Sequence, residues 1–82
     1  MFSIKIERNA ENFIKKLDKK EAELILKKLY SIRENPIRFL KKLSGEKLWR
    51  LRIKDYRIIL DVIVSKKTII VLRVGFRKNI YD

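Results

Sequence analysis

Apolar and polar residues alternate at the start of the chain. Phe2, Ile4 and Ile6 are each followed by a polar residue, a period of two that predicts a strand over residues 1–7 with one buried face. The apolar residues that follow recur every three or four positions instead, which is the spacing of an amphipathic helix. They form two stripes, Ala10, Phe13, Ile14 and Leu17, and then Ala22, Ile25, Leu26, Leu29 and Ile32. Two amphipathic helices are therefore expected after the first strand.

Residues at the expected helix ends support this interpretation. Asn9 can cap the first helix, and Asp18 with Glu21 forms a capping box for the second. Asn35-Pro36 is predicted to end the second helix, because the residue before a proline is displaced from the α region. Few residues separate the two helices, so they are expected to form an antiparallel hairpin.

Alternation with a period of two returns after a predicted connection over residues 36–47. Trp49, Leu51 and Ile53 alternate with basic residues. This pattern predicts a strand with one apolar face and one cationic face.

The rest of the chain is predicted to form two further strands. Residues 56–64 are rich in apolar side chains and indicate a central strand, and a short turn separates them from a last long strand over residues 68–75. The predicted order is strand, helix, helix, strand, strand, strand (β-α-α-β-β-β). This order gives an α+β fold in which the helix hairpin packs on one face of a mainly antiparallel sheet. Residues 1–82 are expected to form a single domain.

The composition excludes several kinds of site. The chain has 82 residues and contains neither cysteine nor histidine. Disulfides and thiolate metal sites are therefore excluded, and the commonest general base is absent. The carboxylates are scattered along the sequence, so neither a metal nor a cofactor is expected. No apolar run is long enough to cross a membrane and no signal peptide is apparent, which predicts a cytoplasmic protein without a membrane partner.

The formal net charge is +12, and most of it lies in the second half of the chain. Residues 36–82 hold thirteen Lys and Arg against four Asp and Glu, whereas residues 1–35 hold nine against six. The mixed signs of the first part are typical of a solvated surface. The imbalance of the second part causes self-repulsion and indicates a polyanionic partner, with nucleic acid the favoured class.

A two-residue turn at Lys54-Asp55 would fix the register of the two central strands. Arg52 then lies directly opposite Arg57, with Cβ atoms about 4.5–5.5 Å apart, and Arg50 and Lys54 share their face. Like charges in these positions repel each other. Because an arginine guanidinium binds phosphate in a bidentate fork, this face is interpreted as a phosphate site.

Two further arginines lie toward the end of the chain. Arg73 is expected to form a structural ion pair with Asp61, which lies about 13 Å from Arg57 along its strand at about 3.3 Å per residue. Arg77 follows immediately beyond the last strand, and Tyr81 comes four residues later. A tight loop there would return the Tyr81 phenol to the cationic face.

Several segments together resemble one known family. They are Leu43-Ser44-Gly45, Trp49-Arg50-Leu51-Arg52-Ile53, Asp55-Tyr56-Arg57, Val71-Leu72-Arg73-Val74-Gly75-Phe76-Arg77 and Tyr81. This ordered set resembles the RelE-like branch of the RelE/ParE toxin superfamily over nearly the whole chain. The resemblance implies a toxin of a type II toxin–antitoxin system, an endoribonuclease that cleaves mRNA in the ribosomal A site. Because the carboxylates are scattered, this cleavage is expected to be metal-independent. It also implies a cognate acidic, RelB-like antitoxin that binds across the same surface in a hetero-oligomer.

The resemblance assigns the catalytic roles to individual residues. The catalytic set is Arg50, Arg52, Arg57, Arg77 and Tyr81, and four lysines, Lys42, Lys47, Lys54 and Lys78, are expected to add RNA contacts. Well-studied members carry lysines on the first basic strand where this chain has arginines, and an arginine is effectively never deprotonated. Cleavage by the 2′-OH of the RNA needs a base, for which Tyr81, with a pKa lowered by neighbouring arginines, and Lys54 are the candidates.

Three alternatives remain open at this point. The superfamily also contains toxins that act on DNA gyrase, in which the RNA-cutting residues are typically not kept. A protein that binds RNA or ribosomes without cleaving RNA would keep the same cationic face. A folded but inactive toxin would keep it as well.

Overall fold

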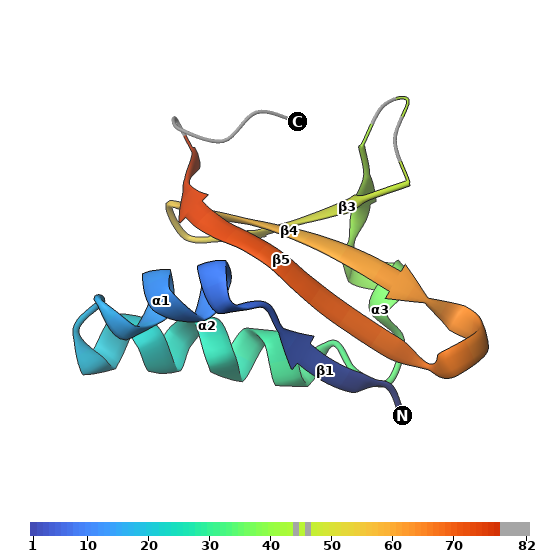
Figure 1. Ribbon diagram of the computed structural model, residues 1–82, viewed down its shortest axis with the longest axis horizontal. Helices are drawn as coiled ribbons and strands as arrows, with labels where there is room; N and C mark the ends of the chain where they lie inside the picture. The colour runs from blue at the N-terminus through green and yellow to red at the C-terminus, as the bar shows by residue number, and fades with distance from the viewer. Residues whose placement is uncertain (44, 46, 78–82) are drawn as a thin grey trace.

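The computed structural model describes residues 1–43, 45 and 47–77. In this part of the chain, three α-helices and five strands form two layers (Figure 1). The elements are β1 (Ser3–Ile6), α1 (Arg8–Lys15), α2 (Lys19–Ser31), α3 (Pro36–Phe39), β2 (Lys41–Lys42), β3 (Trp49–Ile53), β4 (Tyr56–Ile63), the 3₁₀ helix η1 (Val64–Lys66) and β5 (Thr68–Phe76). The strands form one sheet in the order β1-β5-β4-β3-β2. β1 runs parallel to β5, and the other pairs are antiparallel.

The core lies between the sheet and the helices α1 and α2, which cover one of its faces (Figure 1). Alternate residues of the long strands point into this layer, as the period-two pattern predicts. The fully buried side chains from both layers include Ile25, Leu29, Ile32, Ile58, Leu60, Ile69 and Val71. Each such side chain stabilises the fold by about 1.5–3 kcal/mol relative to exposure. The predicted α+β fold, with a helix hairpin on one face of the sheet, is confirmed.

The two long helices begin differently from each other. Asp18 caps α2 as predicted, because its side chain accepts a hydrogen bond of 2.9 Å from the Glu21 backbone N–H. The prediction for Asn9 is wrong, since α1 begins at Arg8 and Glu7 is its N-cap residue without a side-chain hydrogen bond. Glu7 is extended and its N–H still donates to Val71 of β5, so the chain passes directly from the sheet into the helix.

The segment between α2 and β3 is more structured than the sequence predicts. α2 ends at Ser31, before the predicted end at Asn35, and Pro36 begins the short helix α3. The strand β2 that follows has only two residues, both lysines, so it carries no alternation from which it could be predicted. None of the helices within the described residues is long and apolar enough to cross a membrane.

The hairpin of β3 and β4 has the predicted register. Arg52 pairs with Arg57 and Ile53 with Tyr56, on either side of the two-residue turn. Lys54 occupies the first central position of this turn with a φ of 54°. Two-residue hairpin turns require positive φ at that position, and this requirement decides where the Lys54 side chain lies.

Candidate nucleic-acid interface

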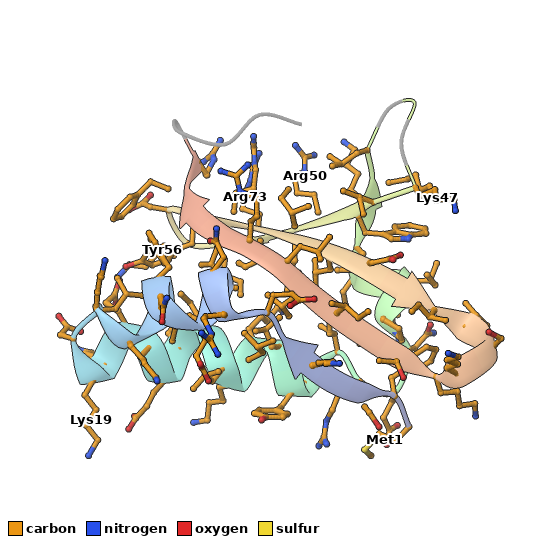
Figure 2. The ribbon with its side chains drawn as sticks, viewed as in Figure 1. Met1, Lys19, Lys47, Arg50, Tyr56 and Arg73 are labelled. Carbon is orange, nitrogen blue, oxygen red and sulfur yellow. The ribbon has the colours of Figure 1, made fainter. Side chains whose placement is uncertain are left out.

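The cationic residues of the sheet gather on the face opposite α1 and α2. Two rows of residues cross the strands there: Arg52, Arg57 and Gly75 form one, and Lys41, Arg50, Ile59 and Arg73 form the next. Neighbouring strands lie about 4.8 Å apart, so the side chains of each row are close neighbours. Figure 2 shows Arg50 and Arg73 extending from the sheet on the side away from the helices. We call Arg50, Arg52, Arg57 and Arg73 the arginine face.

The arginine face carries an electrostatic strain. Arg52 and Arg57 are directly opposite each other, an arrangement that destabilises a sheet by a few tenths to about 1 kcal/mol. Arg52 and Arg73 are exposed, whereas Arg50 and Arg57 are half-buried, and the Arg57 Nε atom itself is buried. A phosphate bridging Arg52 and Arg57 would convert this repulsion into two charge-assisted interactions.

The predicted ion pair between Asp61 and Arg73 is wrong. Arg73 lies opposite Ile59 and Asp61 lies opposite Ile70, and no ion pair between Asp61 and Arg73 is present among the described residues. A bulge in β5 is the reason, because the register shifts by one residue between Ile59 and Leu60. Arg73 therefore joins the other arginines on the open face.

Lys54 lies away from the arginine face, contrary to the sequence-based expectation. Its Nζ atom is 3.2 Å from Glu21 Oε2 at the start of α2. The Tyr56 hydroxyl donates to the other oxygen of the same carboxylate at 2.9 Å. The strand alternation ends at Ile53, and the positive φ of Lys54 turns its side chain toward the helix layer. The structure therefore does not bring Lys54 to the arginine face, where a base would be needed.

The contacts of Glu21 shift two pKa values in opposite directions. The hydrogen bond from Tyr56, followed by the one from Lys54, lowers the pKa of Glu21 below its usual value. Burial, followed by the hydrogen bond to Glu21, raises the pKa of Tyr56. Tyr56 also stacks on Phe76 at a centroid distance of 5.4 Å. Its phenol is therefore protonated at neutral pH and serves the fold, not proton abstraction.

We expect the Glu21 contacts to stabilise the fold in a pH-dependent way. Because the pKa of Glu21 is lowered on folding, this stabilisation is complete above its unfolded pKa and is lost as the pH falls through the folded pKa. In urea titrations, Glu21→Gln should lower the unfolding free energy at pH 7. The difference in unfolding free energy between this variant and the wild type should shrink below about pH 4.5. Tyr56→Phe should lower the thermal midpoint by about 4–8 °C. A wild-type to Glu21→Gln difference that stays constant down to about pH 3 would contradict the assigned role.

Lys42 and Lys47 lie in a different place from the arginines. Lys42 Nζ is 4.7 Å from the centre of the Trp49 ring and donates to the Lys47 carbonyl oxygen at 3.3 Å. Both lysines line a hollow of about 410 Å³ together with Trp49 and Asp61. No residue of the arginine face lines this hollow, so the structure does not bring these two lysines to the arginines.

Arg77 lies beside the arginine face. Its backbone N–H donates to the Asp55 carbonyl oxygen at 2.9 Å, which ties the end of β5 to the turn between β3 and β4. Asp55, Arg57, Phe76 and Arg77 line one hollow of about 710 Å³. The structure therefore brings Arg77 next to Arg57, as the sequence predicts. Lys78 and Tyr81 lie outside the described residues.

One cation beside the arginine face was not identified from the sequence. Lys41 pairs with Arg50 through β2, and its side chain is exposed. A two-residue strand gives no periodic signal, so only the run of basic residues at positions 41 and 42 marked this segment. Among the described residues, no group of three or more Asp, Glu, His or Cys side chains could hold a metal ion.

Comparison with known proteins identifies the family. Residues 4–81 match the model of the ParE toxin of type II toxin–antitoxin systems, parDE. No curated protein sequence matches the chain significantly.

Solved structures share the fold. The chain is similar to a chain of the RelBE2 toxin–antitoxin complex of Mycobacterium tuberculosis, with a TM-score of 0.84 and 20% identity over 93% of this chain and 98% of that one. It is also similar to a chain of the archaeal RelE–RelB complex of Pyrococcus horikoshii, with a TM-score of 0.81 and 26% identity over 96% of this chain and 98% of that one. For a chain of the intact Escherichia coli RelBE complex, the TM-score is 0.78 and the identity is 25% over 93% of this chain and 96% of that one. Because the family model matches nearly the whole chain, this protein belongs to the ParE toxin family of type II toxin–antitoxin systems, within the RelE/ParE superfamily, and has the RelE fold.

Proposed function

We propose that this toxin is an endoribonuclease that cleaves mRNA in the ribosomal A site by attack of the RNA 2′-OH on the adjacent phosphodiester. The observation that carries the proposal is the arginine face, in which Arg52 lies directly opposite Arg57. Such a concentration of like charge suits an anionic ligand. RNA phosphate is an anion that arginine recognises with good geometry.

The chemistry places charge where these arginines lie. As the 2′ oxygen attacks phosphorus, negative charge accumulates on the two non-bridging phosphate oxygens. Arg52 and Arg57 bind these oxygens and stabilise the charge in the transition state. Arg77, which shares a hollow with Arg57, stabilises the 5′ oxygen as its bond to phosphorus breaks. The products are a 2′,3′-cyclic phosphate and a 5′-hydroxyl whose proton comes from water.

Tyr81 is the proposed general base. A free tyrosine has a pKa near 10, and a cation within about 4–6 Å lowers a tyrosine pKa by about 1–3 units. Two other groups on the hairpin are less suited to this role, because Lys54 is paired with Glu21 and the pKa of Tyr56 is raised. In this proposal the Tyr81 phenolate takes the proton of the 2′-OH.

The ribosome supplies what this small site lacks. The arginines hold the RNA by charge but do not fix its conformation. A ribosome that bends the codon in the A site would place the 2′-OH in line with the leaving 5′ oxygen. Such alignment contributes about 7–11 kcal/mol to a reaction. Cleavage of free RNA is therefore expected to be much slower than cleavage of translated mRNA.

The proposed partner is an acidic antitoxin. The Mycobacterium, Pyrococcus and E. coli structures to which the chain is similar are toxin–antitoxin complexes. An antitoxin segment with carboxylates would neutralise the arginine face and fold as it binds, and so block access of RNA in a hetero-oligomer.

Primer extension after induction of the toxin tests the cleavage. We expect new 5′ ends inside translated codons and none in the same transcript when its start codon is removed. The match to a ParE model favours a second candidate, inhibition of DNA gyrase. That function predicts double-strand DNA breaks with intact mRNA, and a purely RNA-binding protein predicts neither kind of break. Intact translated mRNA after growth arrest would refute the ribonuclease proposal.

A further inference from the structure

A second cationic hollow adjoins the arginine face at the edge of the sheet. It has a volume of about 390 Å³ and is lined by Lys28, Phe39, Lys41, Arg50, Leu51 and Arg52. β2 pairs only with Trp49 and Arg50, so the hollow opens where β2 ends and the remainder of β3 continues without it. It therefore connects the arginine face to the helix layer, from which α2 contributes Lys28.

The lining of this hollow combines positive charge with one aromatic ring. Of the six described residues that line it, four are cations and none is a carboxylate. Lys41 lies directly opposite Arg50, with Cβ atoms about 4.5–5.5 Å apart, so the charge continues from β3 to β2 without a break. A continuous cationic track of this kind follows the backbone of a polyanion.

Phe39 is not needed by the core. Its side chain is 44% exposed and belongs to neither hydrophobic cluster of the protein, whereas its neighbour Leu40 is buried. Lys28 Nζ is 5.4 Å from the centre of the Phe39 ring, and Arg38 Cζ is 5.8 Å from it. Both cations lie over the ring, so a base that stacks on Phe39 takes the place of one of them, and the displaced cation is then available to the phosphate.

We propose that this hollow binds a nucleotide of single-stranded RNA that flanks the one held at the arginine face. Its base stacks on Phe39, and its phosphate contacts Lys28 and Lys41. This inference rests on the proposed function in one respect: it takes the phosphodiester that is cleaved to lie at Arg52 and Arg57. An acidic peptide would supply only the anion, whereas a nucleotide supplies both the anion and a π-face that stacks on Phe39.

Direct binding of RNA, without ribosomes, tests this site. The probe is a fluorescent uridine oligomer of about ten nucleotides, and its affinity is measured over a series of salt concentrations. Lys28→Gln with Lys41→Gln should weaken binding and reduce the salt slope by about 0.7, the contribution of the one phosphate on a single strand that the two lysines share. The matched control is Lys27→Gln with Lys66→Gln, which removes the same charge from exposed positions outside the hollow.

The aromatic contact has its own variants. Phe39→Ala should weaken binding by roughly five- to a hundredfold with little change in salt slope, and Phe39→Trp should retain binding, because stacking needs a ring but not a charge. The proposal would be overturned if the Lys28/Lys41 and Lys27/Lys66 double variants lost the same affinity for the oligomer and Phe39→Ala bound it as tightly as the wild type. If mRNA is not cleaved in cells but these variants weaken oligomer binding as expected, the ribonuclease proposal fails and this binding site stands.

Discussion

Arg57→Ala should reduce cleavage of translated mRNA by about 10²–10³-fold, the loss that follows removal of one donor to a developing oxyanion. Arg77→Ala should reduce it to a similar extent, because the two residues share the hollow beside the turn between β3 and β4. Neither side chain belongs to the hydrophobic core, so both variants should fold. Primer extension after induction measures cleavage, and recovery of growth provides a second readout.

The control for these two variants is Arg8→Ala, which removes an exposed arginine at the start of α1, in the helix layer. This variant should cleave as well as the wild type. Circular dichroism and thermal melting of all three proteins separate a loss of activity from a loss of structure. Full toxicity of Arg57→Ala and Arg77→Ala would show that the arginine face is not the catalytic site.

Tyr81→Phe should reduce cleavage by about 10²–10⁴-fold, the usual contribution of a general base. The phenylalanine keeps the ring and removes only the group that accepts the proton. Lys54→Asn should keep its activity, because the lysine amine is paired with Glu21 in the helix layer. Asparagine suits this comparison because it tolerates the positive φ of the turn.

The pair of variants decides between the two bases that the sequence left open. The pH profile of wild-type cleavage, measured on purified ribosomes, should rise with pH as the base loses its proton. The cleavage rate of Lys54→Asn should still rise with pH, whereas the residual cleavage rate of Tyr81→Phe should not depend on pH in this way. The reverse outcome, an inactive but well-folded Lys54→Asn, would return the lysine to the site.

Much of the fold follows from local patterns. The alternation from Trp49 to Ile53 and the two-residue turn were sufficient to predict that Arg52 pairs with Arg57. The helical stripes were sufficient to predict the face that α2 buries. Both features depend on periodicity and turn length, which are properties of neighbouring residues.

The features that the sequence did not predict depend on contacts between distant segments. The pairing of Lys54 with Glu21 follows from one positive φ and the approach of α2 to the hairpin. The position of Arg73 follows from a bulge that is determined only when β4 and β5 pair. β2 exists because β3 provides its partner, not because two lysines favour a strand. The role of Tyr81 remains a prediction.

The parallel pairing of β1 with β5 has a consequence for how the toxin is made. Ser3 pairs with Thr68 and Ile6 with Val71, so the first strand has no partner in the sheet until residues 68–71 have been synthesised. Contacts between residues so far apart in sequence form slowly, because a long loop must close first. The hairpin that carries Arg52 and Arg57 can form earlier from local contacts. We therefore expect a delay between synthesis and toxicity, during which a co-expressed antitoxin can bind a chain that is not yet fully folded.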